Sequence, residues 1–251
     1  MHIGGYNLKT VFINLTPKKR NSMSGYLLRT TELFTKGECV TINYRGGADD
    51  KKILSELENA QNLVFVTPLY VDGLPSHVLE LLQRLENLVP KELNVYTLCN
   101  CGFYEGEQCE LALNMFKIWC KHSGTNFCGG LGLGAGEMHR VLRWNIPISA
   151  ISAVLGGLSL AFHFHTLGIS LLWNAFGFIF FWFIFSLNMF LSARKIAKSI
   201  TKSKNHGLCY STVSFCPSWL FTFLASGYWI LRAFFFHGIP FWKIFKRYNL
   251  K

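Results

Sequence analysis

Hydroxyl and basic side chains gather in residues 16–24 (TPKKRNSMS), between an apolar run and an amphipathic segment. A helix that begins after such a loop exposes unpaired backbone N–H groups and a partial positive charge, which attract phosphate. Thr16, Ser22 and Ser24 would add hydroxyl donors, and the three consecutive basic residues 18–20 would raise the positive potential. The loop is therefore a candidate phosphate site, although an ordinary Ser-capped helix after a solvated loop explains the same residues.

Two more loops follow apolar, strand-like runs. Residues 62–66 break into the loop 67–75 (TPLYVDGLP), which carries an aromatic side chain and two prolines. Residues 92–98 lead into the loop 99–106 (CNCGFYEG). Ligands of open α/β sheets bind at the carboxyl ends of the strands, so both loops are candidate walls of one site.

Other motifs point away from metal and dinucleotide binding. The eight cysteines lack CxxC pairs and nearby histidines at zinc spacing, so we expect reduced thiols and no metal site. Cys99 and Cys101 are the one pair that merits a test for redox chemistry. The glycine run at 129–136 does not have GxGxxG spacing, and no acidic residue follows about 20 positions on to hold a ribose.

The positions of these loops follow from an alternation of strand-like and helix-like segments. Strands are expected at 9–15, 38–44, 62–66, 92–98 and 126–133, and helices at 25–34, 53–60, 76–88 and 107–123. This order predicts an α/β fold with a doubly wound, five-stranded parallel sheet. In the last of these helices Leu111, Met115, Ile118 and Trp119 have helical spacing, and we expect them in the core.

Charge is distributed very unevenly along the chain. Up to Glu137 there are 13 Lys and Arg against 14 Asp and Glu, and beyond it there are 12 basic residues and no acidic one. The basic residues flank long apolar stretches, which is typical of membrane proteins rather than of nucleic-acid binders. We therefore expect membrane lipid as a partner and no nucleic acid.

Two apolar segments, 146–164 and 167–191, are each long enough to cross a hydrocarbon core, which takes ~20 helical residues. Basic residues precede the first and follow the second, so the positive-inside rule places both ends of this hairpin in the cytoplasm. The N-terminus shows no secretory signal, in agreement with a cytoplasmic N-terminal part. His163 and His165 lie in the short break between the two apolar segments. They are candidates for a metal pair or a proton relay; the alternative is that they are solvated turn residues.

The C-terminal part, residues 194–251, is basic and rich in aromatic residues. Its segment 211–231 contains Pro217 and several small polar residues, and we favour a helix in the headgroup layer. A third crossing is the alternative. The expected domains are thus 1–140, a membrane hairpin at 141–193, and an amphipathic region at 194–251.

Residues 9–137 resemble the flavodoxin-like NAD(P)H-dependent FMN reductase family. The second loop matches the T-P-x-Y-x-x-x-x-P form of that family at Thr67, Pro68, Tyr70 and Pro75; residues 16–18 with 21–24 match its first loop, and 100–105 its third. The resemblance implies an FMN phosphate on the first loop and a flavin ring between the other two. The FMN-binding residues that it implies are Thr16, Lys18, Asn21, Ser22, Ser24, Pro68, Leu69, Tyr70, Val71, Asp72, Gly73, Asn100, Cys101, Gly102, Phe103 and Tyr104.

The resulting hypothesis is a membrane-anchored oxidoreductase that binds FMN and uses NAD(P)H as co-substrate, with the flavin domain in the cytoplasm. No side chain is expected to act as a catalytic acid or base, because the flavin supplies the chemistry. A quinone or a membrane-bound redox protein would be the acceptor, and relatives of this kind are commonly dimers. Two alternatives are a flavodoxin-type carrier without nicotinamide turnover, and an interaction protein on a degenerate domain, since Leu15 and Met23 replace residues usual in the family.

Overall fold

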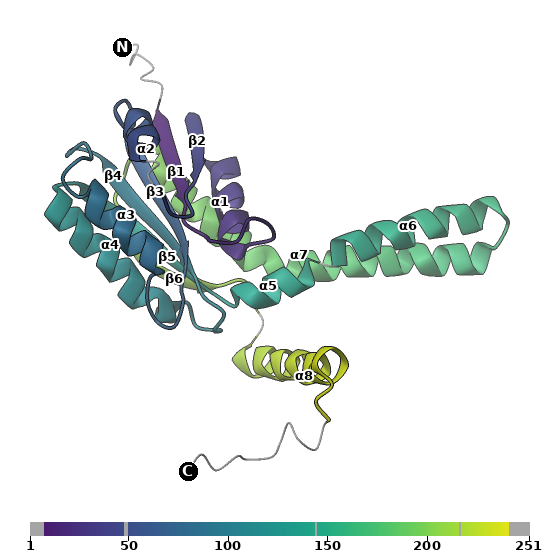
Figure 1. The fold of residues 1–251 in the computed structure, drawn as a ribbon. Helices are drawn as coiled ribbons and strands as arrows, with labels where there is room; N and C mark the ends of the chain where they lie inside the picture. The colour runs from purple at the N-terminus through teal and green to yellow at the C-terminus, as the bar shows by residue number, and fades with distance from the viewer. Residues whose placement is uncertain (1–7, 48–49, 144, 216, 241–251) are drawn as a thin grey trace, which may run out of the picture. The chain divides into compact units, whose positions relative to one another are not determined.

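The computed structural model of the chain describes residues 8–47, 50–143, 145–215 and 217–240, and shows a parallel sheet with helices on both faces (Figure 1). The elements in chain order are β1 (Lys9–Asn14), α1 (Met23–Phe34), β2 (Glu38–Asn43), α2 (Asp50–Leu57), β3 (Asn62–Pro68), α3 (Ser76–Leu85), β4 (Asn94–Asn100), the 3-10 turn η1 (Gly106–Cys109), α4 (Glu110–Ser123), β5 (Asn126–Gly134), α5 (Gly136–Leu142), α6 (Asn145–Ala161), α7 (His165–Thr201), β6 (Gly207–Thr212) and α8 (Ser218–His237). The chain forms two compact units, Met1–Ser214 and Phe215–Lys251.

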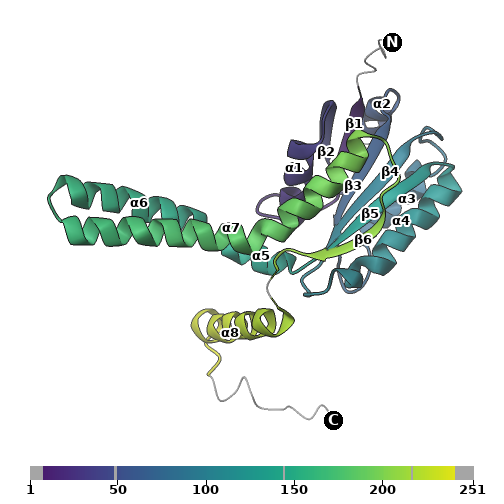
Figure 2. The ribbon, with the colours of Figure 1, turned by 180° about the vertical axis from the view of Figure 1, so that it is seen from behind.

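The strand order β2-β1-β3-β4-β5 is that of flavodoxin-like doubly wound sheets, which confirms the predicted fold class. The order reverses between β1 and β3, and this switch point is where such folds bind their ligands. α2, α3 and α4 cover one face, while α1 and the second half of α7 cover the other (Figure 2). Burial on both faces explains why β3 reads as an unbroken apolar run, with every residue buried.

The prediction of five strands is wrong, because β6 pairs in parallel with β5 and extends the sheet to six. β6 (GLCYST) is short and half polar, so its sequence lacks a strand pattern. Its neighbour β5 contains the glycine run. A side chain on Gly132 would lie 2.5 Å from the carbonyl oxygen of Gly106 and 2.9 Å from the Tyr210 ring, so these glycines permit close packing of β5 against η1 and β6.

α4 is rotated relative to the prediction. Its buried stripe contains Phe116 and Trp119, whose rings lie 5.0 and 5.5 Å from the Phe65 ring. Of the residues expected in the core, Trp119 is buried, whereas Leu111 is 64% exposed and Ile118 and Met115 are also exposed. The prediction failed because two apolar stripes share this helix, and the aromatic stripe fills more of the space above the sheet.

α7 is a single helix of 37 residues that belongs to both the hairpin and the sheet. Its second half is buried against the sheet, and Asn62 Nδ2 donates to the Ile200 carbonyl at 3.0 Å. The Tyr96 hydroxyl lies 3.2 Å from the Ser199 carbonyl oxygen and 2.9 Å from that of Lys204. The expected boundary at 193 therefore falls inside a continuous helix, and residues 194–214 complete the sheet unit.

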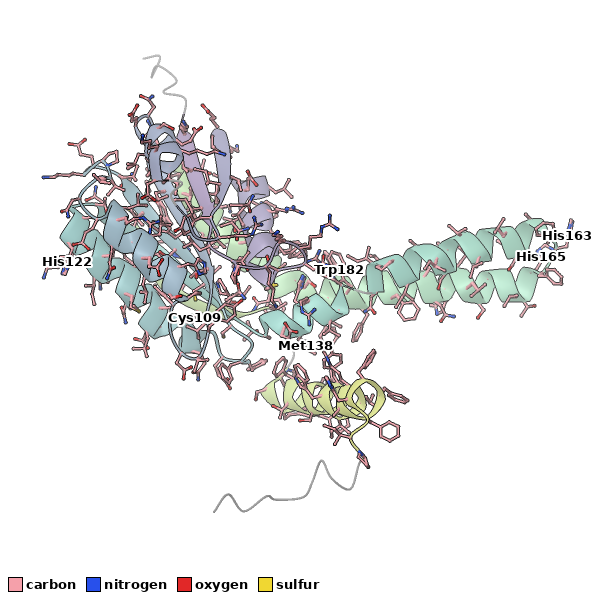
Figure 3. All side chains as sticks on the ribbon, viewed as in Figure 1. Cys109, His122, Met138, His163, His165 and Trp182 are labelled. Atoms are coloured by element: carbon pink, nitrogen blue, oxygen red, sulfur yellow. The ribbon has the colours of Figure 1, made fainter. Side chains whose placement is uncertain are left out.

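α6 and α7 form the predicted apolar hairpin and pack closely along small residues. A side chain on Gly168 would lie 2.6 Å from Leu160 and 2.9 Å from the Gly156 carbonyl oxygen, and Ser149 donates to the Ala175 carbonyl at 2.6 Å. Such contacts are typical of helices that associate in lipid. Most of the remaining hairpin side chains point outward, as Figure 3 shows.

At the hairpin tip the rings of His163 and His165 lie 6.0 Å apart (Figure 3). Within the described chain no group of three or more His, Cys, Asp or Glu side chains is placed to hold a metal. Three described stretches are long and apolar enough to cross a membrane by length and composition: Gly136–Ala161, His165–Thr201 and Ser218–His237. The last is α8, whose Arg232 lies 5.4 Å from the Trp229 ring. The basic C-terminal residues Lys243, Lys246, Arg247 and Lys251 lie outside the described residues.

Candidate functional site

The first loop joins the end of β1 to α1 at the switch point of the sheet. Ser22 is the N-cap of α1, and its hydroxyl accepts a bond from the Gly25 N–H at 3.0 Å. Asn21 adopts a left-handed conformation (φ 53°), which asparagine tolerates better than most residues. Thr16 is buried beneath the loop. The loop thus has the capped-helix geometry that the sequence predicted, with the N-terminal end of α1 beside β1.

A buried hydrogen bond ties the first loop to the third. Ser24 Oγ donates to Asn100 Oδ1 at 2.7 Å, and both side chains are buried. Asn100 ends β4, so this bond connects the loop after β1 to the carboxyl end of β4. It fixes the distance between these two loops.

The second loop ends in a tight two-residue turn. Tyr70 and Gly73 exchange both backbone hydrogen bonds at 3.0 Å, and Val71 and Asp72 between them have φ of 47° and 58°. A β-branched residue at positive φ is strained, and such strain often occurs at ligand sites. Val71 is 100% exposed and Tyr70 is 42% exposed. Partial burial raises the pKa of the Tyr70 hydroxyl, so it stays neutral at physiological pH.

The third loop is held from below by backbone bonds and by thiols. Cys101 N–H donates to the Leu133 carbonyl at 3.0 Å, and its own carbonyl accepts from the Gly136 N–H at 2.9 Å. The Cys101 thiol is hydrogen-bonded to Cys109 and buried, and both effects raise its pKa well above the ordinary range. Because the thiolate is the reactive form, Cys101 is a poor nucleophile in this fold. The seven cysteines in the described residues, Cys99 among them, are free thiols.

The three loops converge on one crevice of about 100 Å³. Ten of the sixteen residues implied by the resemblance line it: Thr16, Lys18, Ser22, Ser24, Pro68, Leu69, Tyr70, Asn100, Cys101 and Gly102. The other six do not line it: Asn21 lines a neighbouring cavity instead, and the remaining five are Val71, Asp72, Gly73, Phe103 and Tyr104.

Three lining residues were not among those implied: Met23, Glu137 and Arg140. The last two form an ion pair on α5, in which Arg140 Nε lies 2.9 Å from both Glu137 carboxylate oxygens. Their i, i+3 spacing is the only signal in the sequence, and no helix was predicted at these positions. This charge pair therefore lines the crevice from α5, the helix that directly precedes the hairpin in the chain.

Structural comparisons give only distant likenesses. No protein-family model and no curated protein matches the sequence. The azoreductase from Bacillus anthracis str. Sterne aligns over 78% of this chain and 99% of its own, at 12% identity and a TM-score of 0.42. The NAD(P)H:quinone oxidoreductase from Methanothermobacter marburgensis aligns over 55% and 93%, at 11% identity and a TM-score of 0.40. The Trp repressor binding protein from Bacillus subtilis aligns over 50% and 83%, at 14% identity and a TM-score of 0.41. These values carry no functional argument, so the fold class rests on the strand order.

The residues that line the crevice suit the chemical groups of FMN, but the volume of the crevice is smaller than a flavin needs. Hydroxyl groups and Lys18 at the α1 end suit a phosphate, and Pro68, Leu69 and Tyr70 form an apolar wall that suits a flat ring. Ligand pockets are usually ~300–1,000 Å³, so the crevice of about 100 Å³ must widen to take a flavin.

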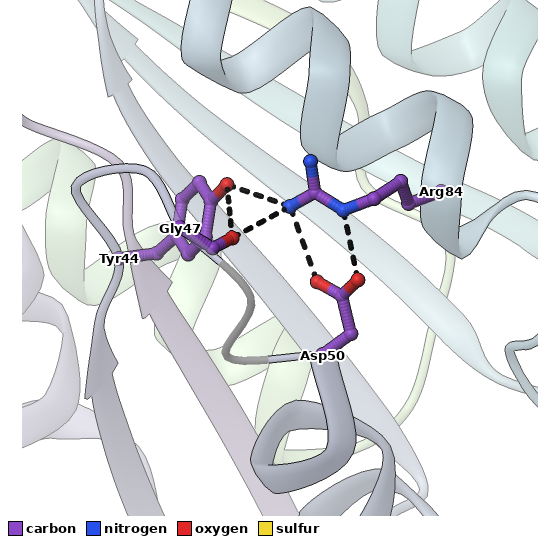
Figure 4. A network of polar contacts seen from close by, with 4 residues as sticks. All are labelled: Tyr44, Gly47, Asp50 and Arg84. Atoms are coloured by element: carbon purple, nitrogen blue, oxygen red, sulfur yellow. Dashed lines mark hydrogen bonds and ion pairs between the residues drawn. The ribbon is translucent and has the colours of Figure 1, made fainter.

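A second polar network stabilises the neighbourhood of the site without lining it. The Arg84 guanidinium binds both Asp50 carboxylate oxygens at 2.8 and 3.1 Å, the Tyr44 hydroxyl at 2.7 Å and the Gly47 carbonyl at 3.1 Å (Figure 4). These bonds join α3 to the loop after β2 and to the first residue of α2. His77, in the first turn of α3, contacts the Leu15 carbonyl through Nε2 at 2.8 Å. α3 thereby holds the base of the first loop in place.

Proposed function

We propose that this chain is a membrane-anchored, FMN-dependent NAD(P)H oxidoreductase. The observation that supports it best is the crevice at the β1/β3 switch point, where loops after β1, β3 and β4 meet and Ser24 binds Asn100. This is the position at which flavodoxin-like sheets bind FMN. A bound FMN would supply the redox chemistry, namely the capacity to take a hydride from a nicotinamide and to pass electrons on to an acceptor.

The residues of the chain would bind and orient the cofactor. Thr16, Ser22, Ser24 and Lys18 would hold the phosphate at the start of α1, and Tyr70 would cover the ring. Backbone N–H groups of the third loop would face its polar edge. No side chain in the crevice is required to transfer a proton, so none is assigned a catalytic role.

The route from the crevice to the membrane supports a membrane-soluble acceptor. Glu137 and Arg140 line the crevice and lie on α5, which leads into α6 of the apolar hairpin. A quinone headgroup in the lipid interface, or a membrane redox protein, would therefore reach the flavin by the shortest path. The sheet unit is assigned to the cytoplasm by the basic residues at both ends of the hairpin, and a homodimer remains a prediction.

The deciding experiment is the absorbance spectrum of the full chain purified in a mild detergent. We expect a flavin band, which anaerobic NADPH or NADH should bleach. A yellow protein whose band resists both nicotinamides would instead be an electron carrier.

One observation favours a second candidate, an interaction protein on a degenerate domain. A crevice of about 100 Å³ that contains Met23 has little room for a flavin. This candidate predicts a colourless protein that ignores added FMN, and either a flavin band or a measurable FMN affinity would eliminate it.

The orientation of the hairpin has its own test. A His163→Cys variant should react with a membrane-impermeant maleimide in intact cells, and a Leu33→Cys variant, at an exposed site on α1, only after permeabilisation. The parent chain gives the background from its native thiols. The reverse pattern would place the sheet unit outside the cytoplasm.

A further inference from the structure

A larger cavity lies on the outer side of the first loop, away from the flavin crevice. It has a volume of about 500 Å³, lies between α1 and the edge strand β2, and falls within the usual ~300–1,000 Å³ of ligand sites. Asn14 and Asn43, joined by a 2.8 Å hydrogen bond, belong to its polar lining. The cavity is thus large enough for a ligand and separate from the walls formed by the second and third loops.

Six basic side chains line this cavity: Lys18, Lys19, Arg20, Arg29, Arg45 and Arg143. In the part of the chain that the structure describes, none of them forms an ion pair. The one carboxylate in the lining, Glu32, accepts a bond from the Thr41 hydroxyl. Like charges from several elements around one hollow repel each other and focus a positive field, which a bound anion would relieve.

The cavity reaches toward the start of the hairpin. Arg143 follows α5, and its guanidinium carbon lies 4.5 Å from the centre of the Tyr26 ring on α1. A neighbouring hollow of about 330 Å³ shares Asn21 and Arg143 with the cavity and is also lined by Arg140 on α5 and by Ile146 and Pro147 in the first turn of α6. Apolar side chains therefore join the cationic ones where the hairpin begins.

We propose that this cavity binds the phosphate-bearing headgroup of an anionic phospholipid, with the acyl chains beside Ile146 and Pro147. Guanidinium groups form paired, charge-assisted bonds to phosphate oxygens, and basic pockets at the cytoplasmic side of membrane helices suit such headgroups. The start of a membrane-spanning α6 lies in the headgroup layer, at the same level as Arg143. A lipid is favoured over a free phosphate compound because the adjoining hollow is lined by the apolar side chains of Ile146 and Pro147.

The inference rests on the membrane anchoring in the proposed function but not on flavin binding. A bound headgroup would fix the tilt of the sheet unit on the membrane. The bound headgroup would also stabilise the first loop, because Lys18 and Ser22 line both the cavity and the crevice.

The test uses the full chain in neutral detergent, titrated with phosphatidylglycerol or phosphatidylcholine and followed by native mass spectrometry. We expect one phosphatidylglycerol to bind in preference to phosphatidylcholine. An Arg29→Gln/Arg45→Gln variant should weaken phosphatidylglycerol binding about a hundredfold, because it removes two charge-assisted contacts that are each worth about one factor of ten. Lys117→Gln/Lys121→Gln, with the same loss of charge on α4, should stay within about twofold of the parent.

Three outcomes would overturn the inference. The first is equal loss in both double variants, which would indicate unspecific attraction. The second is equal binding of phosphatidylcholine, which would show no preference for an anionic headgroup, or full competition by inorganic phosphate or glycerol phosphate at comparable concentration. Such competition would assign the cavity to a soluble phosphate compound. The third is release of the chain from membranes by alkaline carbonate. Absorbance of the same samples reports bound flavin independently. A colourless protein that binds phosphatidylglycerol would therefore contradict the proposed oxidoreductase function and leave the lipid site standing.

Discussion

Ser24 Oγ lies 2.7 Å from Asn100 Oδ1, and this bond joins the loop after β1 to the end of β4 across the switch point. The two residues are 76 positions apart in the chain. Both side chains are buried, so each depends on the other for its hydrogen bond. The bond sets the geometry in which the three loops form one crevice.

Ser24→Ala should destabilise the fold and the site together. It leaves the Asn100 side-chain oxygen buried without its donor, which costs ~1–3 kcal/mol of unfolding free energy. Urea unfolding and FMN titration would measure the two effects. Ser55→Ala, at an exposed hydroxyl on α2, is the matched control. Unchanged stability in Ser24→Ala would show that the bond contributes nothing.

Tyr70→Ala should weaken FMN binding with little effect on stability. The ring is 42% exposed and borders the crevice, so its removal takes away an aromatic wall worth ~1 kcal/mol or more of stacking. Fluorescence titration with FMN measures the loss. Tyr70→Phe keeps the ring and should bind as the parent does. If Tyr70→Ala binds FMN normally, the second loop is structural.

Val71→Asn should stabilise the protein by ~1 kcal/mol. The left-handed conformation costs an ordinary residue ~1–2 kcal/mol, and asparagine tolerates it. Val71→Ala keeps a Cβ without that tolerance and should gain less. Thermal unfolding of the three proteins gives the order. A loss of stability in Val71→Asn would mean that the turn is not strained.

Gly168→Ile should separate the hairpin helices. A Cβ at this position would lie 2.6 Å from Leu160, so the larger side chain forces α6 and α7 apart. This should lower the stability of the hairpin by ~1–3 kcal/mol. Gly177→Ile is the control on the same helix, because nothing lies within 4 Å of its Cβ position. Thermal unfolding in detergent should show a lower midpoint for the first variant alone. Equal midpoints would contradict the close approach of α6 and α7 at Gly156 and Gly168.

Cys101 should resist alkylation at neutral and mildly alkaline pH. Its hydrogen bond to Cys109 and its burial raise its pKa, so raising the pH to about 8 creates almost no thiolate there. Iodoacetamide labelling followed by peptide mass spectrometry should modify the partly exposed Cys209 first and Cys101 only after unfolding. Native labelling of Cys101 as fast as Cys209 would restore Cys99 and Cys101 as a redox candidate.

The sequence determined the parts that depend on local pattern. Unbroken apolar runs marked β1, β3 and β4, because strands buried on both faces need no polar alternation. The TPLYVDGLP loop and the basic loop after β1 could be placed at one sheet edge because parallel strands end together. The hairpin was visible because two long uncharged segments without a polar face are separated by a short break.

Tertiary packing decided what the local pattern left open. β6 became a strand only through pairing with the glycine-rich β5, and α4 rotated because Phe116 and Trp119 fit against Phe65 better than the Leu111 stripe does. The side chains of the first loop divide between two hollows: Ser24 lines the crevice formed by the three loops, and Arg20 lines the cationic cavity. That division depends on the direction in which α1 leaves β1 and packs against α7, and such a long-range contact has no periodic signal in the sequence.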